Sequence, residues 1–280
     1  MAKKIIIGII GGTGKMGQFF KRFFDNNNCK VLISSRKTKL NPKECAKQSD
    51  ILMISVPIDV TLSTIKNIAP YIKKDSLLID TTSIKKSPVD AMLRYSKCEV
   101  IGMHPVFGPN VSSVKNQTVI LCPARSQKWI VWLKNLLEKN KARIKITTPE
   151  KHDEMMSIIQ GLNHFSALST AYAMKDLGIS IQESLEYTSP IYKLRIAMVG
   201  RILNQDPSLY ANIEINNPKN KKALESYMRS VKKLMNIIES KDMKGFLSYF
   251  KECSDFFGNF AEQSEKTSDL LIEQMADLKK

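Results

Sequence analysis

Three histidines are the natural candidates for acid–base chemistry in this chain, because an imidazole titrates near neutral pH. His104 lies in the motif GMHPVFGP, directly after a predicted buried strand. A loop rich in glycine and proline is rigid and can hold a ring in place, so we expect His104 to serve as a general base. Ser83, at the end of the preceding predicted strand, could orient the imidazole or a substrate hydroxyl. The alternative for His104 is a loop histidine bonded to backbone.

The other two histidines are expected on a helix that begins near residue 150. From its apolar neighbours alone, His164 is predicted to be a core residue, and His152 resembles the solvated first turn of that helix. No two histidines have the i, i+4 spacing of a helical zinc site, and the five cysteines are scattered without CxxC spacing. We therefore predict no metal site and reduced thiols.

Arg201 ends the otherwise apolar helical stretch 196–200. A guanidinium on such a face needs a partner, and a carboxylate bound by two hydrogen bonds is the best one. That partner could belong to a substrate or to a buried glutamate of the protein.

A glycine motif follows an apolar run at residues 5–10, in the pattern Gly12-x-Gly14-x-x-Gly17. A strand, these glycines and an amphipathic helix form the arrangement that binds the pyrophosphate of a dinucleotide at a helix N-terminus. The residues predicted to contact the cofactor here are Gly12, Thr13, Gly14, Lys15, Met16 and Gly17. A phosphate-binding P-loop is excluded by spacing, because Ile9 stands where its first glycine would be.

The end of the second predicted strand discriminates between nicotinamide cofactors. An NAD site usually offers a carboxylate there, whereas this chain has Ser35, Arg36, Lys37 and Thr38. Hydroxyl groups and two cations would suit a 2′-phosphate, which favours NADP and leaves NAD possible. The alternative is that Arg36 and Lys37 are surface charges of a loop.

Alternating strands and helices predict the fold of the first part of the chain. Strands are expected at residues 5–10, 30–35, 50–57, 76–80, 99–103, 118–122 and 143–147, with helices after residue 15, at 60–71, from about 88 and at 127–138. This order predicts a doubly wound, parallel, Rossmann-like α/β sheet over residues 1–149. Ligands bind where such strands end, so Val56 and Pro57 join the predicted cofactor contacts.

Residues 150–280 carry helical periodicity and predict an all-α second domain, with helices at 150–175, 181–187, 191–204, 219–240 and 243–275. The apolar residues of its first helix are too many for a helix backed by solvent. Packing against a second subunit explains them, and a monomeric helical core is the alternative.

The net charge of the chain bears on whether its binding partner is a nucleic acid or a small molecule. The 43 Lys and Arg against 27 Asp and Glu give a net charge of +16, but the lysines are spread along the chain and no aromatic platform accompanies them. We therefore expect no nucleic-acid function and attribute the charge to a solvated surface that also attracts an anionic small molecule. No stretch has the length of a membrane span, and no cleavable leader is recognised, so a cytoplasmic location is expected.

Taken together, these motifs resemble the prephenate dehydrogenase family of tyrosine biosynthesis. The resemblance covers nearly the whole chain and rests on GGTGKMG at 11–17, SVP at 55–57, DTTSIK at 80–85, HPVFGP at 104–109, HDEMM at 152–156, QGLNHF at 160–165, SPIYK at 189–193, GR at 200–201 and DPSLY at 206–210. The glycine motif is common to many dehydrogenases, whereas HPVFGP, QGLNHF and PIY in this order are specific.

The resemblance implies oxidative decarboxylation of prephenate to 4-hydroxyphenylpyruvate and CO2, with hydride transfer from the ring carbon to C4 of the nicotinamide. It implies that His104 accepts the proton of the ring hydroxyl with help from Ser83, and that Arg201 binds a substrate carboxylate. It moves His164 into the substrate pocket, with Gln160 and Lys193 as further contacts; Lys193 stands where many relatives have arginine. A homodimer through the helical domain is also implied. Arogenate as substrate, or another NADP-linked dehydrogenase of the β-hydroxyacid type, is the alternative.

Overall fold

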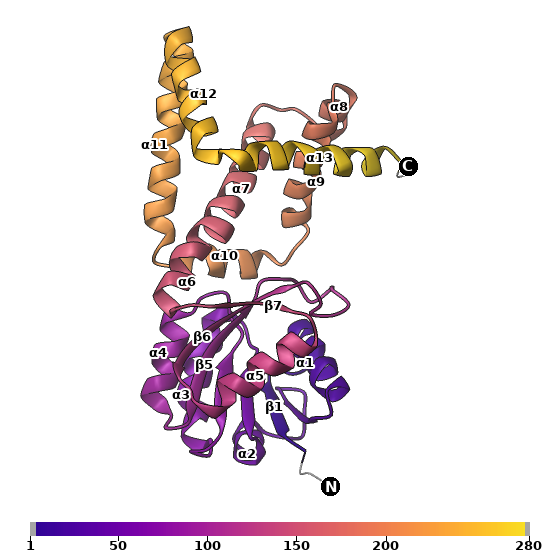
Figure 1. Cartoon of the computed structure of the whole chain (residues 1–280), viewed down its shortest axis with the longest axis vertical. Coiled ribbons are helices and arrows are strands. Elements are labelled where there is room, and N and C mark those ends of the chain that lie inside the picture. Colours follow the sequence, from indigo (N-terminus) through magenta and orange to yellow (C-terminus); the bar gives the residue numbers. More distant parts are fainter. Residues whose placement is uncertain (1–3, 278–280) are drawn as a thin grey trace. The chain divides into compact units, whose positions relative to one another are not determined.

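The computed structural model describes residues 4–277 and divides into two compact units (Figure 1). The first unit contains residues 4–157 together with Ala211–Lys219, and the second contains Ile158–Tyr210 together with residues 220–277. The predicted division into a cofactor-binding domain, residues 1–149, and a substrate domain, residues 150–280, stays a prediction.

The first unit is built on a sheet in the order β2-β1-β3-β4-β5-β6-β7. Its strands are β1 (Ile6–Ile10), β2 (Lys30–Ser34), β3 (Ile51–Ile54), β4 (Leu77–Asp80), β5 (Glu99–Pro105), β6 (Thr118–Arg125) and β7 (Arg143–Ile146). Neighbouring strands from β2 to β5 are parallel. The apolar runs of β3 and β4 are buried at every position, as strands covered on both faces must be.

Helices cover both faces of this sheet. They are α1 (Lys15–Asn26), α2 (Pro42–Gln48), α3 (Ile58–Ile68), the 3-10 turn η1 (Ala69–Tyr71), α4 (Lys86–Tyr95), α5 (Lys128–Lys139) and α6 (Pro149–Met156). Because side chains alternate along a strand, Ile51 and Met53 pack on one face and Leu52 and Ile54 on the other.

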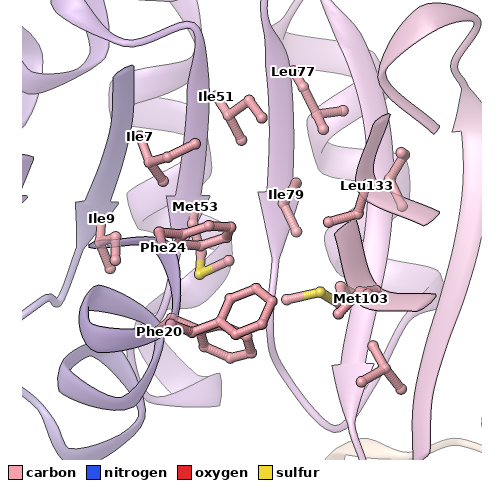
Figure 2. Close-up of a cluster of buried hydrophobic side chains, with 14 of the residues drawn as sticks. Ile7, Ile9, Phe20, Phe24, Ile51, Met53, Leu77, Ile79, Met103 and Leu133 are labelled. Carbon is pink, nitrogen blue, oxygen red and sulfur yellow. The ribbon is translucent and has the colours of Figure 1, made fainter. Parts of the chain in front are cut away.

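The first face carries the aromatic part of the core. Figure 2 shows side chains from β1, β3, β4 and β5 meeting Phe20 and Phe24 of α1 and Leu133 of α5. On the opposite face, Ile65 of α3 and Met92 of α4 pack with Leu52 and Leu78. This two-sided packing confirms the Rossmann-like fold class.

Two features of the first unit differ from the sequence-based expectation. β6 is antiparallel to β5, although β6 and β7 are parallel to each other. Residues 106–117, which join β5 to β6, contain no helix, and a parallel pair needs a long crossover connection. The helix α2 was not predicted, although Asn41 caps it by accepting the Glu44 N–H at 2.9 Å and Pro42 starts it.

The second unit is helical. It contains η2 (Ser157–Leu162), α7 (Asn163–Asp176), α8 (Ile181–Glu186), α9 (Pro190–Leu203), α11 (Asn220–Glu239), α12 (Met243–Phe257) and α13 (Asn259–Asp277), and α10 (Pro207–Asn216) crosses the boundary between the units. The all-α expectation is therefore confirmed, and in Figure 1 α11 and α12 run side by side.

The predicted helix boundaries need two corrections in this region. The single helix expected at 150–175 is α6, a π-helical segment η2 and α7 in succession. The helix expected at 243–275 is interrupted at Gly258, whose φ of +51° glycine adopts readily. α10 was not predicted. Within residues 4–277, no helix combines the length and the apolar character needed to cross a membrane.

Candidate active site

The glycine segment between β1 and α1 forms an open backbone cradle. Gly11 has φ of +82° and donates its N–H to Ser34 O at 2.8 Å, so the sharp turn falls one residue before the predicted motif. Gly14 is the N-cap of α1 and no side chain caps the helix. The N–H groups of its first turn are therefore left for an anion.

The glycines keep the turn between β1 and α1 compact. A Cβ on Gly14 would lie 3.3 Å from Gly11 O, a tight contact with backbone. A Cβ on Gly17 would lie 2.6 Å from Gly11 O, which shows how closely α1 packs on the turn. Gly12 is buried and Thr13 and Lys15 are exposed, while Met16 packs on the core.

The turn after β2 presents two unpaired cations. Ser35 N–H donates to Thr38 Oγ1 at 2.8 Å, and Lys37 N–H donates to Ser35 Oγ at 3.1 Å. These bonds close the turn and leave Arg36 and Lys37 exposed, without an ion pair to any residue between 4 and 277. Val56 and Pro57 follow β3, and Pro57 is the N-cap of α3.

His104 lies inside β5, which corrects the loop position expected from the sequence. β5 continues to Pro105 because β6 pairs with it, with His104 opposite Ile120. The side chain is 3% exposed. Ser83, in the segment that follows β4, is half-buried.

His152 corrects a second expectation, because it is 1% exposed and not solvated. Its Nε2 lies 2.9 Å from His104 Nδ1, and its Nδ1 lies 2.8 Å from Asp153 Oδ1. The cause is the packing of α6 on β6 through Met156, which contacts Ile120 and Cys122. His152 precedes Met156 by four residues and so shares its face of the helix.

Asp153 is held by the start of α4. Its Oδ1 accepts the Lys85 N–H at 2.7 Å, and its Oδ2 accepts the Lys86 N–H at 2.9 Å. Asn217, in the segment that returns to the first unit, donates its side-chain N–H to the Asp153 carbonyl at 2.8 Å. Neither Asp153 nor Asn217 was among the predicted site residues.

A buried ion pair lies beside the imidazoles. Lys85 and Asp80 are fully buried and paired, and Lys85 Nζ also donates to Met103 O at 3.0 Å. Thr82 Oγ1 donates to Asp80 Oδ2 at 2.6 Å. Gly102 makes room for this pair, because a Cβ there would lie 3.0 Å from Lys85 Cδ.

Burial and charge keep both imidazoles neutral. Burial, with contributions from His152 and the Lys85 cation, lowers the pKa of His104 well below 6.5. Burial also lowers the pKa of His152 from 6.5, and its hydrogen bond to Asp153 opposes this shift without overcoming it.

The predicted substrate contacts lie in the helical unit. The His164 ring packs edge-on against Tyr210, with centroids 4.6 Å apart. Burial raises the pKa of Tyr210, and the charge of Arg201 opposes that shift, so Arg201 lies close to the phenol. Tyr210 was not among the predicted site residues, although it ends the quoted DPSLY motif.

The other two predicted substrate contacts, Lys193 and Gln160, differ in how exposed their side chains are. Lys193 is exposed in the first turn of α9, and Gln160 lies in η2 with its Oε1 buried and unpartnered among the residues described. Arg201 is exposed in α9, and its predicted contact with a substrate carboxylate stays a prediction.

Two family models match the chain, one after the other. The first, described as prephenate dehydrogenase, nucleotide-binding domain, matches residues 30–146. The second, described as prephenate dehydrogenase, dimerization domain, matches residues 148–252.

Curated relatives give the same result over almost the whole chain. A probable arogenate/prephenate dehydrogenase of Methanocaldococcus jannaschii is 38% identical, over 96% of this chain and 64% of the relative. A T-protein of Haemophilus influenzae is 34% identical, over 98% of this chain and 72% of the relative. The chain thus spans about two thirds of the length of these relatives.

Solved structures share the fold at lower identity. A prephenate dehydrogenase from Aquifex aeolicus superposes with a TM-score of 0.72 at 19% identity, covering 88% of this chain and 96% of that one. An arogenate dehydrogenase from Synechocystis superposes with a TM-score of 0.73 at 16% identity, covering 92% and 100%.

Proposed function

This chain belongs to the prephenate dehydrogenase family, and on that premise we propose that it oxidatively decarboxylates prephenate to 4-hydroxyphenylpyruvate and CO2 with NADP as oxidant. The observation that carries the proposal is His104, a buried imidazole whose pKa is lowered well below 6.5. A base that must take a hydroxyl proton at neutral pH has to be unprotonated, and this environment keeps it so.

Each step of the proposed reaction is assigned to a group of the chain, the cofactor or the substrate. When bound, the nicotinamide supplies the acceptor for the hydride that leaves the ring carbon bearing the hydroxyl. His104 takes the hydroxyl proton, assisted by Ser83, and returns it to the phenolate oxygen after CO2 has left. The bond to the ring carboxylate breaks, its electron pair makes the ring aromatic, and CO2 departs, so little acid catalysis is needed for that group.

Substrate binding is assigned to the helical unit. Arg201 would bind a substrate carboxylate through two parallel hydrogen bonds, which its exposed and unpaired guanidinium permits. His164, Gln160 and Lys193 complete the proposed contacts, and the unpartnered Gln160 Oε1 supports a ligand there. Arogenate is the alternative substrate, and the name of the Methanocaldococcus relative includes both compounds.

The cofactor preference rests on Arg36 and Lys37. No carboxylate ends β2 to bind a ribose 2′-hydroxyl, and both cations are free to meet a 2′-phosphate. An Aquifex aeolicus prephenate dehydrogenase has been solved with hydroxyphenyl propionate and NAD+, so NAD is the competing cofactor. A homodimer through the helical unit is part of the proposal, in line with the matched dimerization domain.

The test measures formation of reduced nicotinamide with prephenate or arogenate, each with NADP and with NAD. We expect turnover with prephenate and a lower KM for NADP than for NAD. His104→Asn should lower kcat by about 10²- to 10⁴-fold while NADP still binds. Absence of turnover with both compounds would refute the proposal, and a fully active His104→Asn would remove the base.

A further inference from the structure

His104, His152 and Asp153 form a continuous chain of hydrogen bonds that the catalytic proposal does not use. The two links are 2.9 Å between His104 Nδ1 and His152 Nε2, and 2.8 Å between His152 Nδ1 and Asp153 Oδ1. All three side chains are buried, so water does not compete for these bonds. The directions of the bonds therefore decide which nitrogen of His104 carries a proton.

The direction is set at the Asp153 end. Asp153 accepts backbone N–H groups at both oxygens, from Lys85 and Lys86 at the start of α4. An ionised carboxylate has only acceptors, and the N-terminus of a helix favours its negative charge. His152 Nδ1 must then be the donor toward Asp153 Oδ1.

The remaining protons follow from the neutrality of His152. Burial lowers its pKa, and the Lys85 cation acts in the same direction, so one ring nitrogen carries the only proton. With that proton on Nδ1, His152 Nε2 is an acceptor, and His104 Nδ1 must donate to it. His104 Nε2 is then the unprotonated atom.

We propose that His152 and Asp153 are positioning residues that hold His104 as its Nδ1–H tautomer, so that Nε2 is the atom that accepts the substrate hydroxyl proton. This inference rests on the proposed function for its catalytic consequence, and on the hydrogen-bond chain alone for the tautomer. His152 does not contact the substrate in this scheme. It prevents the alternative tautomer, which would present an N–H to a hydroxyl that has to lose its proton.

The arrangement also explains why α6 is anchored so firmly. Met156 packs on β6, and Asn217 holds the Asp153 carbonyl at 2.8 Å from a segment far along the chain. A ring displaced by an ångström would break a hydrogen bond that is 2.9 Å long. Anchors on both sides of His152 keep that bond formed.

The tautomer can be measured directly, without turnover. The chain has three histidines, so ¹⁵N-labelled rings give a small set of signals, which substitution of each histidine in turn assigns. In the full chain with NADP at neutral pH, we expect His104 to show a protonated Nδ1 and an unprotonated Nε2. A protonated Nε2 on His104 would overturn the proposal.

Two substitutions test the catalytic consequence. His152→Phe keeps a ring but removes the acceptor, and we expect kcat to fall about 10²-fold with a much smaller change in KM. His152→Gln can offer its amide oxygen to His104 Nδ1 and should restore most of kcat. Lys151→Gln, on an exposed neighbour of the same helix, is the matched control and should match the unmodified enzyme.

The outcomes separate the two proposals. A folded His152→Phe protein with unchanged kcat, or a His152→Gln protein as slow as His152→Phe, would refute the positioning role. If His152→Phe does not fold, the ring-nitrogen signals of the unmodified protein still decide the tautomer. If neither prephenate nor arogenate is turned over, the proposed function fails, and the tautomer result stands or falls independently.

Discussion

At the scale of single residues, the site depends on the environment of one imidazole. Burial removes water that would stabilise the charged ring, and Lys85 adds repulsion against a second positive charge. His152 also acts on His104, and Asp153 of α6, Lys85 before α4 and Asp80 of β4 act on His152. Nearby, Cys122 of β6 packs with Met156 of α6. Burial of Cys122 raises the pKa of its thiol to about 12, so this group stays uncharged.

This environment predicts the acid limb of the pH profile. His104 acts when unprotonated, and its pKa lies below the ordinary 6.5, so kcat/KM should stay level as the pH falls through 6.5 and decline only below it. The measurement is kcat/KM for prephenate between about pH 5 and pH 8 in one mixed buffer. Half-maximal kcat/KM at or above pH 6.5 would contradict the lowered pKa of His104.

The lowered pKa values of His104 and His152 also predict that the folded protein loses stability at acidic pH. Both histidines have a lower pKa in the folded state than in the unfolded chain, so the unfolded chain takes up protons first as the pH falls below 6.5. The free energy of unfolding is unaffected by these rings above that value. Below it, each ring lowers that free energy by up to about 1.4 kcal/mol per pH unit until it is protonated in the folded state.

At the scale of elements, much of the fold was predictable because the apolar runs of the sheet are unambiguous. β3 and β4 are buried at every position, and such runs between helices specify a doubly wound sheet. The parallel direction predicted for β6 is wrong, because the direction depends on the connection before the strand and not on the strand's own residues. The helix α2 has only 7 residues, too few for periodicity to identify.

Sequence patterns also identified only some residues of the candidate site. His104 was identified from its motif, but its partner His152 was assigned to solvent because charged residues surround it in the sequence. The useful signal was the four-residue spacing between His152 and Met156, which places both on one face of α6. Asp153 and Asn217 could not be found by periodicity, because their roles arise from contacts with α4 and with a segment far along the chain.

The turn between β1 and α1 yields a prediction that separates binding from folding. At Gly14 the φ is −72°, and an added methyl would meet a single backbone atom, Gly11 O at 3.3 Å, so Gly14→Ala should cost little stability yet weaken NADP binding about tenfold or more. At Gly17 the methyl would meet Gly11 O at 2.6 Å and Gly12 Cα at 2.8 Å, both backbone atoms. Gly17→Ala should therefore cost about 1–3 kcal/mol of stability.

Thermal unfolding and NADP titration of the two variants provide the measurement, and each variant is the control for the other. For Gly14→Ala, weakened NADP binding is expected with a smaller fall in Tm than for Gly17→Ala. A lowered Tm is expected for Gly17→Ala, by about 2–4 °C per kcal/mol. Unchanged NADP affinity in Gly14→Ala would argue against a pyrophosphate at this backbone.

At the scale of the whole molecule, the chain order links the two units. The sequence leaves the first unit after Ser157, builds helices, and returns for Ala211–Lys219 before entering α11. Asn217 in that return holds the Asp153 carbonyl, so the hydrogen-bond chain of His104 depends on a segment that follows the residues proposed to bind substrate.

The helical unit provides the last prediction, which concerns the homodimer. α12 has no buried residue in the single chain, and its Phe250 and Leu247 are 65% and 61% exposed. Exposed aromatic and aliphatic side chains of this kind are typical of interaction surfaces, and we predict that a second copy of the chain covers them. We expect a sedimentation mass of twice the chain's 31.7 kDa, with a Tm that rises with protein concentration.

Phe250→Asp should shift the equilibrium toward single chains, because a carboxylate buried at such an interface has no partner. Lys244→Gln, on the same helix, is the control and should leave the dimer intact. A single-chain mass for the unmodified protein would contradict the dimer, and an unaffected dimer in Phe250→Asp would exclude α12 from the interface.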